Sequence, residues 1–446
     1  MPPLRRFLSR AMRDEATGPP ACGTNRRRGT DRELTRGTVR ATSDRMPPGS
    51  SLAPVARVGV HLVVLFVTMG AVLPFLPVWL AQEKGLSGGE IGLLLALISF
   101  TRVLSGPLLA AWSQDHSGTH VQMQALAAAT VVLVVLYALA GPPWLVIVAG
   151  VLFGVAFQSQ LPLADAETMA VAEPVPRIHY AQVRALASLA FVGASLVVGH
   201  LIERYGAWAG WGWMAAGAGL ALASSFLLPL RPVSRPSGAP LTGFGPRLSK
   251  AMRVFRTPGL IRVVIAASLL QCAHGFYYGF SSNLWLAQGI GPDVVSALWS
   301  VGVVAEVAFL MFVAPRLDRV RPQHLLLLAA LLSLVRWGGL ALEPPLAVTF
   351  ALQTLHAGSF AMVLVATLRF VQTRVPPHQT GDAQQLSSSL VFAPMMGATI
   401  LGGGFLAEAF GTAGYWASAG LAVAGIGVLL VRRVRSGAGG TGAGGP

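Results

Sequence analysis

Apolar runs of membrane-spanning length recur along this chain, with only short polar breaks between them. A bilayer core about 30 Å thick is crossed by roughly 20 apolar residues in a helix, which satisfies its own backbone hydrogen bonds. Charged residues make up 11% of the chain and hydrophobic residues 53%, whereas a soluble domain carries about 25% charged residues. The sequence therefore predicts an all-α integral membrane protein. Twelve transmembrane helices are expected, near residues 58–82, 90–113, 120–140, 144–172, 180–203, 207–230, 258–287, 293–314, 323–342, 345–371, 380–407 and 412–432.

The positive charge of the chain is distributed unevenly. The net charge is +15, and most Lys and Arg residues fall in the N-terminal segment, in alternate loops and at the C-terminal end. The remaining loops offer little beyond Lys84 and Arg204. This asymmetry follows the positive-inside rule for membrane proteins. We favour this explanation of the positive charge over binding to nucleic acid. We expect both termini to be cytoplasmic, in a membrane of the bacterial inner (plasma) type.

The chain repeats itself after a little over 200 residues. The motif WLAQ ends the first predicted span at Trp79–Gln82 and the seventh at Trp285–Gln288. Parallel repeats predict two pseudo-symmetric six-helix bundles around a cavity near the membrane midplane. The expected organisation is a disordered basic cytoplasmic tail (1–54), an N-terminal bundle (55–230), a cytoplasmic linker (231–257), a C-terminal bundle (258–433) and a glycine-rich tail (434–446). An alternative is that translation starts at Met46, which leaves the tail without function.

Three ionisable side chains interrupt apolar runs of the second half: Glu306, Arg336 and His356. An acidic residue at the centre of a membrane helix costs about 3 kcal/mol, so such residues are functional candidates. Arg336 keeps its charge and needs an anion, which is Glu306, a substrate carboxylate or both in turn. We expect a proton relay, because protonation of Glu306 would free the arginine. The alternatives are a neutral, hydrogen-bonded glutamate and a permanent Glu–Arg clamp between helices.

Other polar and aromatic residues lie at positions from which they could line the same cavity. Trp299 falls on the same helical face as Glu306. Arg102 sits at the middle of the second span, where a cavity-facing position is expected. Arg184 lies near the inner end of the fifth span, and the alternative there is a side chain that snorkels to the interface.

Two groups leave their role open. His61 in the first span and His274 in the seventh either line the cavity or pack in the interior. Aromatic side chains of the seventh span either stack on a ring-bearing substrate or serve as packing and interfacial anchors. They are Phe276, Tyr277, Tyr278 and Trp285.

Short motifs in a fixed order resemble a known family. The loop Asp115–Gly118 has the form D-x-x-G, and the loop Leu317–Arg321 reads LDRVR. Along the spans stand LPFLPVWL, PLADA, YAQVRALAS, LWSVGVVAEV, LVRWG and LHAGSFAMVLVATLRFV. On these residues the chain, over roughly 58–432, resembles the major facilitator superfamily, nearest to its phenylpropionic acid permease group and more distantly to lactose permease. The resemblance places four residues in the signature loops of that superfamily: Asp115, Gly118, Asp318 and Arg319.

The resemblance also implies roles for residues inside the spans. Asp165 and Arg184 match the carboxylate and the arginine of the sugar-binding pair in lactose permease. Glu306, Arg336 and His356 match its proton-coupling set. The chain departs from that pattern at Ser359, where lactose permease has a second carboxylate, so proton coupling would use Glu306 or Asp165 alone, or be absent. The substrate-binding residues that we expect are Arg102, Asp165, Arg184 and Trp299.

The sequence predicts a secondary active transporter that works by alternating access, with proton-coupled uptake of a small organic solute, an aromatic or other carboxylic acid being favoured. The alternatives are a proton symporter for sugars or nucleosides, a drug-efflux carrier and, in another class, a non-transporting membrane receptor or scaffold. No nucleophile–base pair or phosphate-binding glycine loop points to an enzyme. No cofactor is expected, and no metal site, because the cysteines and histidines lack ligand spacing. The expected partners are a small-molecule substrate, protons and the lipid bilayer, without nucleic acid, and the chain is expected to be a monomer.

Overall fold

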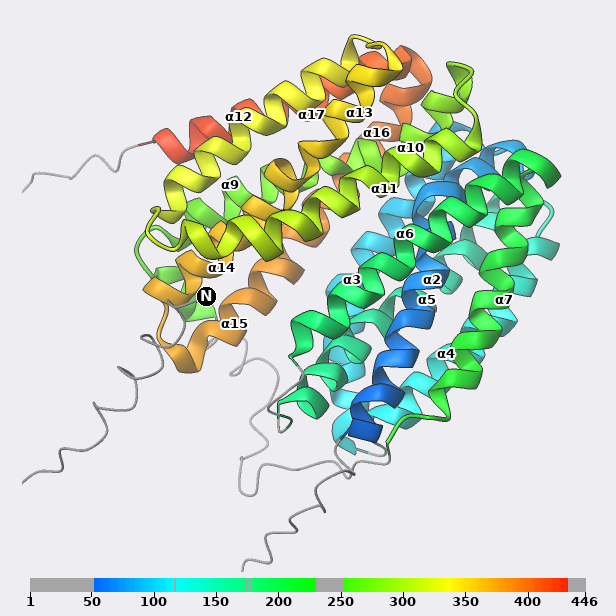
Figure 1. Cartoon of the computed structure of the whole chain (residues 1–446), viewed down its shortest axis with the longest axis horizontal. Coiled ribbons are helices and arrows are strands. Elements are labelled where there is room, and N and C mark those ends of the chain that lie inside the picture. Colours follow the sequence, from blue (N-terminus) through cyan, green and yellow to red (C-terminus); the bar gives the residue numbers. More distant parts are fainter. Residues whose placement is uncertain (1–51, 116–117, 174, 176–178, 230–251, 432–446) are drawn as a thin grey trace, which may run out of the picture. The chain divides into compact units, whose positions relative to one another are not determined.

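The structure is a computed structural model that describes residues 52–115, 118–173, 175, 179–229 and 252–431 (Figure 1). Within these ranges every regular element is a helix. The predicted tails up to residue 51 and from residue 432 on lie outside the described residues, as does most of the predicted linker.

Long, continuous helices form the first half of the chain, whereas the second half contains helices divided into shorter pieces. The first half contains α2 (Leu52–Gln82), α3 (Gly88–Asp115), α4 (Thr119–Leu139), α5 (Pro143–Ala172), α6 (Tyr180–Tyr205) and α7 (Ala207–Ser225). The second half contains η1 (Arg253–Arg256), α9 (Leu260–Cys272), α10 (His274–Ala287), α11 (Pro292–Ala308), η2 (Phe309–Val313), η3 (Ala314–Leu317), α12 (Pro322–Ala341), α13 (Leu346–Thr354), η4 (Ala357–Ala361), α14 (Met362–Arg374), η5 (Pro377–Gln379), α15 (Thr380–Leu386), η6 (Ser387–Phe392), α16 (Ala393–Phe410), η7 (Gly411–Gly414) and α17 (Tyr415–Leu430).

Each predicted span overlaps one helix or a consecutive set of helices in the described residues. By length and hydropathy, nine of the helices in the described part can cross a membrane, and one of these, Ala383–Leu430, covers most of two predicted spans. The prediction of an all-α integral membrane fold is therefore confirmed.

Proline and glycine set several of the helix boundaries. Pro143, Pro292 and Pro322 occupy the first turn of α5, α11 and α12, where the missing N–H group has no helical partner to lose. Gly206 lies between α6 and α7 with φ of 79°, a conformation that glycine adopts without steric cost. The tight connection lets two long helices pack against each other in antiparallel fashion.

The second half departs from regular α-helix at several places. The predicted span 258–287 divides into α9 and α10 at Ala273, and the span 345–371 divides at Leu355. In addition, η2, η4 and η6 are π-helical segments. Such segments arise when one residue is inserted into a helix, and they occur frequently at functional sites.

Helices of the same half pack mainly on one another. In the first half α2 contacts α6 and α7, and α4 contacts α5 and α7; in the second half α12 contacts α17 and α14, and α9 contacts α17. The halves meet chiefly where α3 lies along α16 and α6 lies along α11 (Figure 1). We propose on this basis the division into two six-helix bundles that the repeat predicts.

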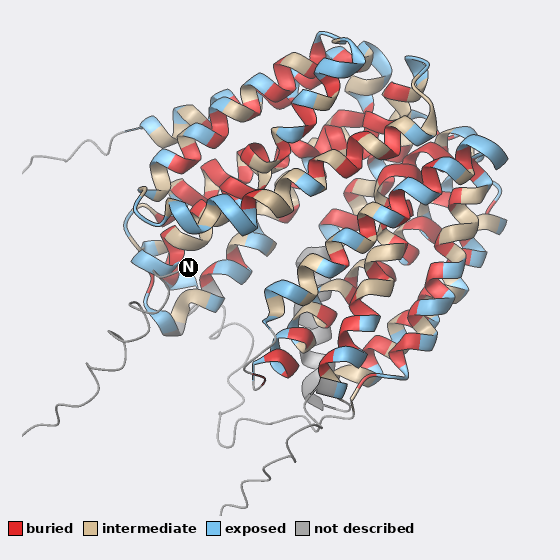
Figure 2. Cartoon of the chain, in the orientation of Figure 1, coloured by how far each residue is buried: buried red, intermediate tan, exposed pale blue. Residues whose placement is uncertain are grey.

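Burial distinguishes the interior of the helix packing from its membrane-facing surface. Figure 2 shows buried residues where helices face each other and exposed residues on the outward sides. The repeated tryptophans Trp79 and Trp285 are both buried. Large apolar side chains on the outward surface, such as Leu139 and Leu152, are exposed. In an integral membrane protein these side chains contact lipid and need no protein partner.

Candidate functional site

A cavity of about 470 Å³ lies between helices of both halves. The first half contributes residues of α2, α3, α5 and α6, and the second half contributes α10, α11, α16 and the region around His356. Its lining is largely apolar and aromatic, with Arg184 and Glu306 as its charged side chains. A cavity of this size suits a small organic molecule.

Arg336 on α12 is fully buried and is held by neutral groups. Its Nη1 donates to His356 Nδ1 at 3.0 Å and to Ser359 Oγ at 3.0 Å, and its Nη2 donates to Gln353 Oε1 at 2.9 Å. Its guanidinium also lies 4.7 Å from the centre of the Tyr277 ring. Among the residues that the structure describes, no carboxylate forms an ion pair with Arg336. The predicted direct contact with Glu306 is therefore replaced by a contact through His356.

His356 stands between Arg336 and Glu306. A guanidinium can only donate hydrogen bonds, so the contact with Arg336 requires His356 Nδ1 to be the acceptor. The proton of the neutral imidazole is then on Nε2, which lies 3.5 Å from Glu306 Oε2. We assign this tautomer from the hydrogen-bond geometry. While Arg336 stays in place, His356 cannot accept a second proton at Nδ1.

Ser359 connects the network to His274. The hydroxyl of Ser359 accepts from Arg336 and lies 3.2 Å from His274 Nε2. His274 Nδ1 lies 3.1 Å from the carbonyl oxygen of Gln271, so Nδ1 carries the proton and Nε2 accepts from Ser359. His274 is fully buried and does not line the cavity. The serine at this position thus serves as a neutral bridge between the arginine and a second histidine.

Aromatic rings line the cavity beside this network. The rings of Tyr277 and Trp299 lie 4.5 Å apart, and Tyr278 stacks on Trp299 at 6.1 Å. The indole N–H of Trp299 donates to Ser282 Oγ at 3.0 Å, which fixes the ring. All three rings line the cavity. Among the predicted aromatic group, Phe276 and Trp285 are buried away from it.

The charged pair of the first half is simpler and more exposed. Arg184 Nε lies 3.7 Å from Asp165 Oδ1, and the hydroxyl of Tyr180 donates to the same oxygen at 3.1 Å. The guanidinium of Arg184 stacks 4.2 Å from the centre of the Phe66 ring, and its Nη1 is buried without a hydrogen-bond partner. Arg184 lines the cavity and interacts electrostatically with Glu306, whereas Asp165 lies outside the lining. The two residues come together, but only the arginine reaches the cavity.

The remaining predicted residues lie elsewhere. Arg102 and Asp115 belong to α3, and their side chains lie outside the described part of the structure. Gly118 precedes the first residue of α4. Asp318 and Arg319 are exposed in the turn after η3. His61 is buried in the first half and bonds Ser224 Oγ at 2.8 Å, away from the cavity.

Two residues that the sequence did not single out take part in these contacts. Gln353 bonds Arg336 and Tyr277, and the available signal was an amide three residues before His356 in an otherwise apolar run. Arg369 lies on α14, and its guanidinium donates to the backbone carbonyls of Leu317 and Asp318. It therefore holds the second signature loop against α14.

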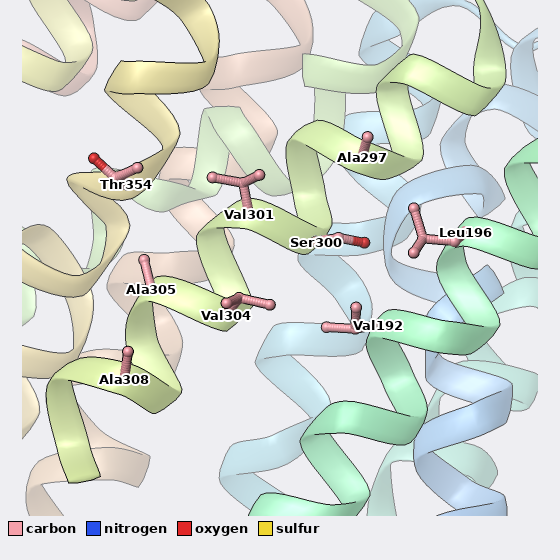
Figure 3. Close-up of a pocket in the computed structure, with 9 residues that line it drawn as sticks. All are labelled: Val192, Leu196, Ala297, Ser300, Val301, Val304, Ala305, Ala308 and Thr354. Carbon is pink, nitrogen blue, oxygen red and sulfur yellow. The ribbon is translucent and has the colours of Figure 1, made fainter. Parts of the chain in front are cut away.

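A second, apolar groove of about 520 Å³ lies between α6 and α11. Figure 3 shows Val192 and Leu196 of α6 opposite the side chains of α11, with Thr354 of α13 nearby. The hydroxyls of Ser300 and Thr354 donate to backbone carbonyls of their own helices. The groove therefore offers no free polar group for chemistry or for specific recognition of a polar solute. Within the described ranges, no group of three or more His, Cys, Asp or Glu residues is arranged to hold a metal ion.

Comparison with known proteins gives consistent results. A model of the MFS_1 like family matches residues 55–417. The "Probable 3-phenylpropionic acid transporter" of Escherichia coli is 30% identical over 360 residues, which cover 79% of this chain and 91% of that protein. The lactose permease of Klebsiella oxytoca is 25% identical over 327 residues, which cover 68% of this chain and 76% of that protein. The solved structure of the nucleoside transporter NupG is similar with a TM-score of 0.71 at 16% identity, covering 85% of this chain and 99% of that one.

Proposed function

We propose, because this chain belongs to the MFS_1 like family of major facilitator transporters, that it carries a small carboxylic acid into the cell together with a proton. The protein is a secondary transporter in an integral membrane fold. The solute would bind in the central cavity and be released to the other side by alternating access. An aromatic acid is the favoured substrate, in a bacterial-type inner membrane with both termini cytoplasmic and the chain acting as a monomer.

The observation that carries the proposal is the distribution of charge in the cavity. Arg184 stands on the wall formed by the first half, while Glu306 stands on the wall formed by the second half. The rings of Tyr277, Tyr278 and Trp299 line the cavity as well. A carboxylate on Arg184 with a ring against these aromatic side chains would satisfy both kinds of contact.

Electrostatics links the proton to an anionic solute. When Arg184, Asp165, Arg336 and Glu306 are all ionised, their charges sum to zero. Protonation of Glu306 leaves one positive charge in excess, which favours binding of an anion. By linkage, a bound anion raises the affinity for the proton by the same factor. A neutral sugar gains nothing from this excess charge, so the arrangement favours an acid over the sugar and nucleoside alternatives.

The test is uptake into proteoliposomes from a panel of labelled solutes, with and without an inward proton gradient. The panel pairs 3-phenylpropionate and benzoate with maltose and uridine. We expect gradient-driven accumulation of at least one aromatic acid, and little accumulation of the neutral solutes. Accumulation of a sugar or nucleoside alone would establish the alternative symporter, and solute-driven proton movement in inverted vesicles with net outward flux would establish efflux. Gradient-independent uptake of every solute would overturn proton coupling.

A further inference from the structure

Gln353 lies at the meeting point of these aromatic rings and the buried arginine. It is fully buried at the end of α13, one turn before His356. Its Oε1 accepts from the hydroxyl of Tyr277 at 3.1 Å and from Arg336 Nη2 at 2.9 Å. Because Arg336 can only donate, the amide must present its oxygen to the guanidinium. The position of this one oxygen therefore depends on both the tyrosine and the arginine.

The arrangement leaves the amide nitrogen of Gln353 without a partner. Gln353 Nε2 is buried and donates no hydrogen bond within the described residues. An unsatisfied buried donor is unfavourable, and an apolar side chain of similar size would avoid it. A residue needed only for packing would gain from that replacement. The cost indicates that Gln353 is kept for its oxygen, which holds Arg336.

Tyr277 connects this oxygen to the cavity. One side of the tyrosine lines the cavity beside Trp299, and its ring also lies 4.7 Å from the Arg336 guanidinium. A solute that moves the ring must therefore also move its hydroxyl relative to Gln353. Gln353 is in turn next to the place where the helix is interrupted, at Leu355, followed by the π-helical segment η4. A helix interruption gives this residue room to shift.

The geometry points to Gln353 as the positioning residue through which a solute in the cavity controls Arg336. In the present arrangement Arg336 occupies His356 Nδ1 and keeps the histidine neutral. Displacement of Tyr277 loosens Gln353 from Arg336, and the arginine leaves His356 Nδ1. Nδ1 then accepts a proton that enters through the cavity, and the proton on Nε2 passes to the carboxylate of Glu306, which leaves the histidine neutral again. This inference rests on the proposed proton-coupled function and assigns the step by which the solute acts on the proton site.

The titratable and charged groups that face this set come from several helices. They are Arg184 on α6, His274, Tyr277 and Tyr278 on α10, Glu306 on α11, His356 beside η4 and Tyr415 on α17. A change in the pH profile of a variant must be interpreted against all of them. The experiment therefore compares variants that remove a neutral hydrogen-bonding group and leave Arg184, Glu306 and Arg336 in place.

The experiment uses the full chain in proteoliposomes with the acid that the wild type accumulates best. Gln353→Leu and Tyr277→Phe each remove one side of the shared hydrogen bond. We expect both to retain solute exchange in the absence of a gradient, to lose proton-driven accumulation by about tenfold, and to shift the pH profile of net uptake. The double variant should be no worse than the single ones, because both act on one contact.

Matched controls come from the first half of the chain. Gln160 is fully buried and bonds Thr130, and Tyr137 is buried with a hydroxyl that has no hydrogen-bond partner among the described residues. Gln160→Leu and Tyr137→Phe change the same chemical groups away from Arg336. We expect both controls to keep the wild-type ratio of accumulation to exchange. Equal loss in controls and test variants would overturn the inference, because it would show a general packing effect.

A second variant covers the case in which Gln353→Leu does not fold. Gln353→Glu keeps the shape and puts a carboxylate beside Arg336, which should pin the arginine. We expect exchange without accumulation near neutral pH and recovery of accumulation in acid, where the carboxyl group becomes neutral. Parallel loss of exchange and accumulation, or an unchanged pH profile in Gln353→Glu and Tyr277→Phe, would overturn the role of Gln353. If the wild type accumulates no acid in response to the gradient, the proposed function itself fails, and this inference with it.

Discussion

The charged groups of the two halves are built in opposite ways. In the first half, Arg184 and Asp165 form an ion pair at 3.7 Å with side chains that are 38% and 27% exposed, on helices that run without interruption. In the second half, Arg336 is 0% exposed and is held by an amide, a hydroxyl and an imidazole. The helices around it change to π-helix at η2, η4 and η6.

This difference suggests a division of labour. A partly exposed ion pair on continuous helices changes little in energy when a solute arrives, so it is suited to anchoring the solute. A buried arginine without a carboxylate partner is poised between several neutral acceptors, and small shifts in geometry change its energy strongly. The surrounding π-helical segments allow such shifts. We therefore propose that the first half binds and the second half switches.

The largest expected effect follows from neutralising the carboxyl group of the switching half. Glu306→Gln removes the group whose protonation creates the excess positive charge. Proton-driven accumulation should fall about 100-fold, while exchange of solute in the absence of a gradient continues. The matched variant Asp165→Asn in the first half should retain proton-driven accumulation. If Asp165→Asn uncouples transport and Glu306→Gln does not, the assignment of the two halves is reversed.

The anchoring role of the first half predicts a loss of affinity for acids. Arg184→Gln removes the cation that would pair with the carboxylate of the solute, and a hydrogen bond to a charged group contributes about 2 kcal/mol. Binding of the transported acid, measured by titration calorimetry in detergent, should weaken about thirtyfold. The neutral amide of the same acid serves as the control ligand and should bind equally well to both proteins. An acid affinity unchanged by Arg184→Gln would rule out a carboxylate anchored there.

The seam between the halves provides a smaller effect. A Cβ atom on Gly404 of α16 would lie 2.3 Å from the carbonyl oxygen of Gly88 on α3, so the helices touch through their backbones. Gly404→Val should push them apart and shift the equilibrium toward the state open at this seam by about tenfold. The reporter is a cysteine introduced into the cavity by Ser99→Cys, in a variant that lacks Cys22 and Cys272. The measurement is the rate at which a membrane-impermeant reagent alkylates this cysteine.

Gly402 is the control for that substitution, because a Cβ there would have no neighbour within 4 Å. Gly402→Val on the same helix should leave the alkylation rate unchanged. Equal rates for the two valine variants would mean that the seam does not open during transport. Access to the cavity would then have to change through bending of individual helices alone.

The helices were predictable from the sequence, but their interruptions were not. Apolar runs of this length have one stable form in lipid, so the predicted boundaries of the spans near Gln82 and Ala172 agree with α2 and α5 within a few residues. A π-helical segment differs from α-helix by one inserted residue, and its position depends on packing against neighbouring helices. The sequences around Phe309 and Ala357 contain no feature that predicts a π-helical segment there.

The site was predictable in its members and only partly in its contacts. Charges inside apolar runs identified Glu306, Arg336 and His356, because such residues are rare in membrane helices. The order of contacts could not be predicted, since it depends on rotamers and on the rotation of three helices about their axes. The role of Gln353 could not be predicted, because an amide is tolerated in many buried positions. The functional roles of these residues stay predictions until the variants are measured.

The smallest expected effect concerns the helices themselves. If the second half bends and the first half does not, backbone amides near the π-helical segments should open more readily than those in continuous helix. Amides of Phe309–Val313 and Ala357–Ala361 should exchange hydrogen about fivefold faster than those of α6 around Val198, after correction for intrinsic rates. Hydrogen exchange with mass spectrometry in nanodiscs measures this difference. Because Val198 is buried and Val313 is exposed, the comparison should be repeated with the buried pair Phe309 and Phe191. Uniform protection in that pair would mean that both halves move as rigid bodies, and the switching role would then rest on Arg336 and its side-chain partners alone.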